Sequence, residues 1–85
     1  MIASAAHLPM PSQLKSLDYT VNGVDMLKLN QLLEARTGHY LQTDGHGWQI
    51  RTPASNLFIE WAGGTQSENA AACISYLARQ GFTLR

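Results

Sequence analysis

The feature that most constrains the fold is a helix signature near the C-terminal end of the chain. Thr65 is followed three residues later by Glu68, the spacing of a capping box at the start of a helix. Apolar residues then recur at helical spacing, at Ala70, Cys73, Ile74 and Leu77. Gly81 stands where helices commonly end, and Phe82 is placed to make the hydrophobic contact of a Schellman motif. The pattern predicts one helix from about Gln66 to Gln80.

Three short segments before this helix alternate between large and polar residues, as half-buried strands do. They are residues 39–43, 48–52 and 57–62. Residues 44–47 and 53–56 between them are rich in Gly, Asp, Asn, Ser and Pro, which favour turns. The segments therefore predict an antiparallel meander. In its third strand, alternation places Leu57, Ile59 and Trp61 on one face, and Phe58 and Glu60 on the other.

The N-terminal part allows two interpretations around Asn22-Gly23. Residues 17–21 alternate as a strand, and Asn-Gly is a strong hairpin signal if Val24 begins a second strand. Alternatively, Asn22 caps a helix and Asp25 is its reciprocal partner. We favour a helix from about Val24 to Thr37, because its leucines fit helical spacing and Gly38 can terminate it. Whether Val24–Leu27 begins a helix or a hairpin strand stays open.

The expected fold class is therefore α+β. We expect the element order β-α-β-β-β-α, in which a three-strand meander and an N-terminal strand form one small antiparallel sheet against two helices. A short last strand over 82–85 stays open. Residues 1–12, which include Pro9 and Pro11, are expected to be an extended or loosely ordered arm, and residues 13–85 a single domain.

Charge and size limit what the chain can do. It has 85 residues, enough for one core. Only 14% are charged, and six basic residues balance six acidic ones. Because phosphate contacts supply most nucleic-acid affinity, this neutral and scattered distribution argues against a nucleic-acid binder. A surface with so little charge is also less protected against association, so we expect a homodimer or a bound partner.

The same composition suggests a cytoplasmic protein. Cys73 is the single cysteine and cannot form an internal disulfide. The apolar stretches are far shorter than the ~20 residues of a membrane span. Residues 1–10 lack the basic and long apolar regions of a signal peptide.

No motif predicts catalysis or a cofactor. The carboxylates are dispersed, and Gly63-Gly64 lacks the lysine and glycine spacing of phosphate-binding loops. Cys73 lies on the apolar stripe of the last helix, where a free cysteine packs as a small hydrophobe. We therefore expect no enzyme and no cofactor.

The one constellation suited to a metal is His39, Asp44 and His46 around a single turn, with His7 a distant addition. Turns use Asp and Gly for backbone reasons alone. We assign no metal ligand, and a metal at His39, Asp44 and His46 stays an open hypothesis.

Between about Asp25 and Ala78, the order helix, meander, helix resembles the double-stranded-RNA-binding domain family. The similar residues before and in the last helix are Gly63, Gly64, Ser67 and the alanines 70–72. The resemblance implies duplex-RNA binding through basic residues at the start of that helix. Glu68 and Asn69 stand in those positions here, and an acid at a helix N-terminus repels phosphate. Nucleic-acid binding is therefore the alternative function.

The leading hypothesis is a small non-enzymatic interaction module, an adaptor or inhibitor that binds a protein partner and itself. Small stand-alone domains of this kind often serve as adaptors or inhibitors, including those encoded by phages and other mobile elements. Aromatic residues and Arg dominate binding hot spots, so we expect the partner at one face of the sheet. The candidate partner-binding residues are Tyr40, Trp48, Arg51, Phe58 and Glu60.

Overall fold

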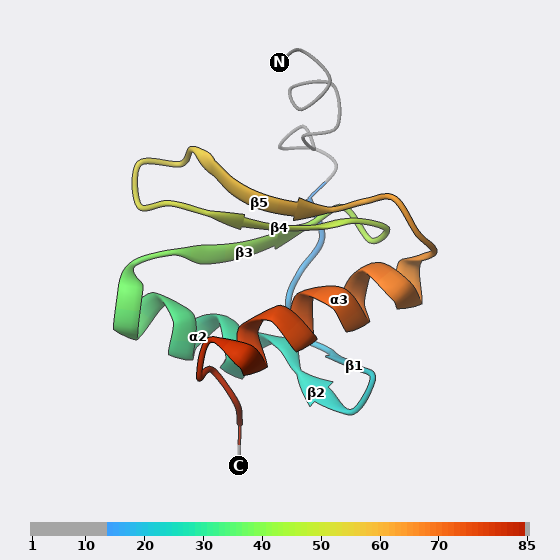
Figure 1. Cartoon of the computed structure of the whole chain (residues 1–85), viewed down its shortest axis with the longest axis horizontal. Helices are drawn as coiled ribbons and strands as arrows, with labels where there is room; N and C mark the ends of the chain where they lie inside the picture. The colour runs from blue at the N-terminus through green and yellow to red at the C-terminus, as the bar shows by residue number, and fades with distance from the viewer. Residues whose placement is uncertain (1–13, 85) are drawn as a thin grey trace.

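Two helices lie on one side of a three-stranded antiparallel sheet in the computed structural model of the chain, which describes residues 14–84 (Figure 1). The strands follow each other in space in the order β3-β4-β5. Their bounds are Tyr40–Thr43 for β3, Trp48–Arg51 for β4 and Leu57–Trp61 for β5. The helices are α2, Met26–Thr37, and α3, Gln66–Arg79. The α+β class is confirmed.

The segment before α2 is a hairpin of its own. Strands β1, Thr20–Val21, and β2, Val24–Asp25, pair in a separate two-stranded sheet. Asn22 and Gly23 between them have φ values of 52° and 78°, the two left-handed residues that a type I′ turn requires. The order is therefore β-β-α-β-β-β-α, one strand more than expected.

The prediction that Asn22 caps a helix starting at Val24 is wrong. Asp25 is the N-cap, and its Oδ1 accepts a hydrogen bond of 3.1 Å from the backbone N–H of Lys28. Val24 belongs to the hairpin, whereas Leu27 belongs to the helix. The helix thus begins two residues later than predicted, at the first position after a side chain that can cap it.

Helix α3 has the predicted capping box. The backbone N–H of Thr65 donates to Glu68 Oε1 at 2.8 Å, and that of Glu68 donates to Thr65 Oγ1 at 3.1 Å. Gly81 is left-handed with φ 92°, and the backbone N–H of Phe82 donates to Leu77 O at 2.9 Å. The described residues after the helix form no strand, and the arm expected over residues 1–12 lies outside the described part of the chain.

The core lies between the sheet and the two helices. It takes the predicted stripe of α3, the inner face of α2 and alternate residues of β3 and β4. Its buried members are Met26, Leu29, Leu33, Leu41, Trp48, Ile50, Ala70, Cys73 and Leu77.

A bulge in β5 changes which faces two of its residues occupy. Ile50 pairs with Ile59, but Arg51 pairs with Leu57, so Phe58 is an extra residue opposite no partner. Leu57 therefore shares the outer face with Arg51, and Phe58 turns toward the helices. The strict alternation predicted from the sequence is wrong for Leu57 and Phe58.

Candidate functional site

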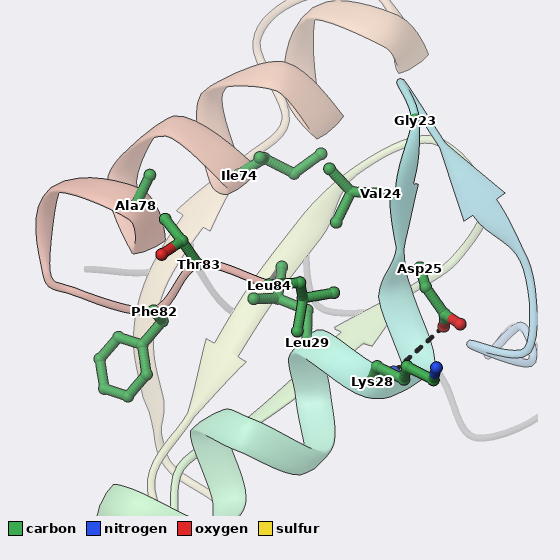
Figure 2. Close-up of a pocket in the computed structure, with 10 residues that line it drawn as sticks. All are labelled: Gly23, Val24, Asp25, Lys28, Leu29, Ile74, Ala78, Phe82, Thr83 and Leu84. Atoms are coloured by element: carbon green, nitrogen blue, oxygen red, sulfur yellow. Dashed lines mark hydrogen bonds between the residues drawn. The ribbon is translucent and has the colours of Figure 1, made fainter.

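An apolar groove lies between the two helices (Figure 2). Helix α2 packs mainly on β3 and β2, whereas α3 packs mainly on β4 and β5. The sides of the two helices that face each other therefore do not pack on the sheet. They line a groove of about 430 Å³. Its lining residues are Gly23, Val24, Asp25, Lys28, Leu29, Ile74, Ala78, Phe82, Thr83 and Leu84.

Local sequence signals hold the walls of this groove in place. The type I′ turn directs the hairpin toward α3, where Asn22 Nδ2 donates to Ser67 O at 3.4 Å. The glycine stop at Gly81 turns the chain back, so that Phe82 and Leu84 lie against the helices. Helical spacing of four places Ile74 and Ala78 on one flank of α3.

The groove is mainly aliphatic and carries charge only at its α2 rim. Lys28 is exposed, and its backbone N–H is the partner of the Asp25 carboxylate. That carboxylate is therefore engaged in the cap of α2. The ammonium group of Lys28 remains available to a bound molecule.

A second, smaller hollow lies on the other side of Phe82. It has a volume of about 180 Å³ and shares Phe82 with the groove as a common wall. Its remaining lining residues are Leu33, Thr37, His39, Ile50, Phe58, Tyr76, Leu77 and Gln80. The two hollows together form one interrupted apolar surface, which we call the helix-side surface.

Aromatic contacts surround the second hollow. The rings of His39 and Phe58 have centroids 4.9 Å apart. Phe58 is still 51% exposed, the largest fraction among the exposed large apolar residues of the described chain. Tyr76 packs against Trp61 with centroids 5.4 Å apart, and Arg36 lies over the ring of Phe82. An apolar side chain of a partner would meet aromatic rings here.

The predicted binding residues do not form one surface. Tyr40, Arg51 and Glu60 lie on the outer face of the sheet, where strand pairing aligns them. Phe58 lies on the helix side because of the bulge. Trp48 is 1% exposed and belongs to the core, which removes it from any surface.

On the outer face, the polar side chains are largely bonded to one another. Arg51 donates from Nε to Gln42 Oε1 at 3.2 Å and from Nη1 to Ser55 O at 2.9 Å. The Tyr40 hydroxyl donates to Ser55 Oγ at 3.0 Å. These bonds cross-link the strands and the turn, and they leave this face polar.

Gln49 lies on the central strand of the same face. Its Nε2 donates to Glu60 Oε2 at 3.1 Å, although the residue is only 1% exposed. Its Oε1 has no hydrogen-bond partner. Gln49 lines neither the groove nor the second hollow, so we assign it no ligand.

The turn histidines do not converge on a metal site. His39 and His46 lie beyond opposite ends of β3, a strand that spans about 13 Å. Asp44 Oδ1 instead accepts bonds of 2.9 Å from the backbone N–H groups of His46 and Gly47. Burial alone would raise the pKa of Asp44, but these donors lower it on balance. Within residues 14–84, no three His, Cys, Asp or Glu side chains come close enough to hold an ion, and His7 lies outside them.

Cys73 is fully buried, as its place on the apolar stripe predicts. Burial raises the pKa of its thiol to about 12. A thiol in this state is a poor nucleophile, because the thiolate is the reactive form. Cys73 is therefore a packing residue of the core.

No family model matches the sequence, and neither a curated protein nor a solved structure matches the chain. Among the described residues, no helix combines the length and apolar character needed to cross a bilayer.

The helix-side surface is the part of the site that the sequence did not predict. Ile74 was assigned to the core stripe, but it is half-buried and lines the groove. Ala78, four residues later, continues its flank. Six of the nine α3 positions from Ala70 to Ala78 carry Ala, Ile or Leu, and this stripe is wider than the core alone needs. That width is the signal that could have revealed a groove.

Proposed function

We propose that this chain is a small protein-interaction module that binds a peptide segment of a partner protein on the helix-side surface. The observation that carries the proposal is the apolar groove of about 430 Å³ beside α2 and α3, continued past Phe82 by the second hollow. By binding such a segment, the chain would act as an adaptor or as an inhibitor of the partner protein.

The dimensions suit side chains of a peptide. Binding pockets commonly have volumes of about 300–1,000 Å³ with apolar walls and few polar groups. The volume of the groove lies in this range, and Lys28 and Asp25 are the charged residues at its rim. The second hollow, about 180 Å³, is large enough for one big apolar side chain. Leu84 of this chain already lines the groove, so an aliphatic side chain fits its walls.

The expected affinity is modest. Each large apolar side chain that leaves water contributes about 1.5–3 kcal/mol. Two such anchors, one in each hollow, must also offset the cost of ordering the peptide and its partner. A reversible complex follows, which suits an adaptor or a regulatory inhibitor.

The alternative of nucleic-acid binding has no comparable support. The start of α3, where the resembling family binds phosphate, carries the Glu68 carboxylate bonded to Thr65. Lys15, Lys28 and Arg51 lie on three different parts of the fold: beside the end of β3, on α2 and on β4. Within residues 14–84, these three cations form no continuous path for a phosphate backbone.

The test is selection from a random peptide library against the whole chain. The library contains peptides of about 16 residues, which are ~24 Å long when helical. We expect enriched peptides that bind Ala78→Gln about tenfold more weakly than the wild type, because a polar side chain then projects into the groove.

Ser75→Gln is the matched control, since Ser75 and Ala78 are both exposed on α3 but Ser75 does not line the groove. Its affinity for the enriched peptides should equal that of the wild type. The proposal fails if no peptide is enriched, or if Ala78→Gln and Ser75→Gln bind equally well.

A further inference from the structure

We infer that the segment bound by the helix-side surface is an acidic amphipathic helix. This inference rests on the proposed function and names the class of its partner. Two features carry it: the apolar walls of the groove and the sign of the charge along α2.

The walls favour a helix over an extended chain. The groove is lined mainly by side chains of Val24, Leu29, Ile74 and Ala78, which offer no hydrogen bonds. An extended peptide would press unpaired backbone N–H and C=O groups against them, and such groups are costly to bury. A helix satisfies its own backbone and presents apolar residues three or four apart. The two hollows on either side of Phe82 can take successive anchors of this kind.

The charged side chains at the helix-side surface carry a net positive charge, because two cations outnumber the one carboxylate of Asp25. Lys28 lines the groove, and Arg36 lies over Phe82, the wall shared by both hollows. They are eight residues apart on α2, about 12 Å along its axis. The rotation of 100° per residue turns Glu34 to the opposite flank of the helix, away from both cations.

The one acid on this side of α2 keeps its negative charge but is held at the first turn of the helix, so one positive charge remains in excess. Asp25 caps the helix by accepting from the backbone of Lys28. Of the other groups that titrate, His39 stacks on Phe58 at the second hollow, and Arg79 belongs to the last turn of α3. The rim therefore complements a partner with carboxylates on the side of its apolar stripe that faces α2.

The test uses the peptides selected on the wild-type chain. We expect them to carry net negative charge relative to the unselected library, with apolar residues three or four apart. Circular dichroism of a synthetic selected peptide should show helix formation on binding. Its affinity should fall about fivefold in Lys28→Glu, and added salt should weaken wild-type binding.

Lys15→Glu is the control, because it changes the net charge equally at a position beside Gly45, away from the groove. Its affinity should stay within about twofold of the wild type. Equal losses in Lys28→Glu and Lys15→Glu would overturn the inference, as would selected peptides that are neutral, basic or bound without helix formation. If such peptides still depend on Ala78, the proposed function stands and the inference alone fails.

A second copy of this chain is the competing occupant. Sedimentation equilibrium of the wild type, Ala78→Gln and Ser75→Gln decides between them. We expect all three to sediment alike. A dimer that Ala78→Gln alone dissociates would assign the groove to another copy and overturn the inference.

Discussion

Arg36 and Phe82 join the end of α2 to the segment that follows α3. The guanidinium carbon lies 5.3 Å from the centroid of the phenyl ring. Arg36 Nη1 also donates to the carbonyl of Gly81 at 3.0 Å. One exposed side chain therefore holds the wall that separates the two hollows of the helix-side surface.

Replacing this side chain should loosen the wall. We expect Arg36→Ala to lower the free energy of unfolding by about 1 kcal/mol, the sum of a weak cation–π contact and one exposed hydrogen bond. Urea unfolding followed by tryptophan fluorescence measures it. Arg79→Ala is the control, since Arg79 is also an exposed cation in the last turn of a helix. Equal effects of the two variants would mean that only the helix dipole matters.

The elements that the sequence predicted best are those decided by local rules. Thr65, Glu68 and Gly81 mark both ends of α3 through the helix and its immediate neighbours in sequence, so these ends can be predicted without knowledge of distant contacts. The core position of Cys73 follows from the same periodicity.

The start of α2 was predicted wrongly because two local signals compete there. Asn22 can cap a helix or begin a type I′ turn. Asp25, three residues later, is an equally good cap, so the chain can form the turn first and the helix afterwards. The contact of Asn22 with Ser67 O, 45 residues away, further stabilises the turn, and local sequence does not reveal it.

The candidate site was predicted only in part because strand register is not a local property. Alternation alone places Phe58 on the outer face, but the bulge opposite Arg51 reverses it. Trp48 was chosen for its residue type, whereas its burial depends on the layer of helices above β4. The groove lies between elements that are far apart in the chain. Its prediction would therefore require both the strand register and the packing of the helices on the sheet.

The type I′ turn predicts a specific cost for an added methyl group. Gly23 has φ 78° and open space around it, so Gly23→Ala introduces backbone strain without a steric clash. We expect a loss of about 1 kcal/mol in the free energy of unfolding. Gly63→Ala is the control, because Gly63 also has open space but no positive φ. A loss as large in Gly63→Ala would refute the role of the turn.

Asp44 should contribute to stability in a pH-dependent way. Its pKa is lowered from 3.8 because the folded turn donates two backbone hydrogen bonds to the carboxylate. The contribution is therefore present above about pH 4 and is lost as the pH falls through the folded-state pKa. Asp44→Asn keeps an acceptor and should lack this loss in acid. Asp44→Ala should lose about 1 kcal/mol at neutral pH, when measured by urea unfolding.

Cys73 should make the free energy of unfolding depend on pH in the alkaline range. Its folded-state pKa is raised from 9.0 to about 12, because the thiolate would be buried in the core. The thiol's contribution to stability is thus complete below pH 9 and is lost as the pH rises toward 12, by about 1.4 kcal/mol per pH unit. Cys73→Ala removes this slope, and the difference between the two unfolding curves isolates it from the titration of tyrosines and lysines. Iodoacetamide should accordingly label the native wild type far more slowly than the chain in urea at the same pH. If native labelling is as fast as labelling in urea, Cys73 is accessible, and the thiol cannot have the packing role that its place on the stripe of α3 assigns to it.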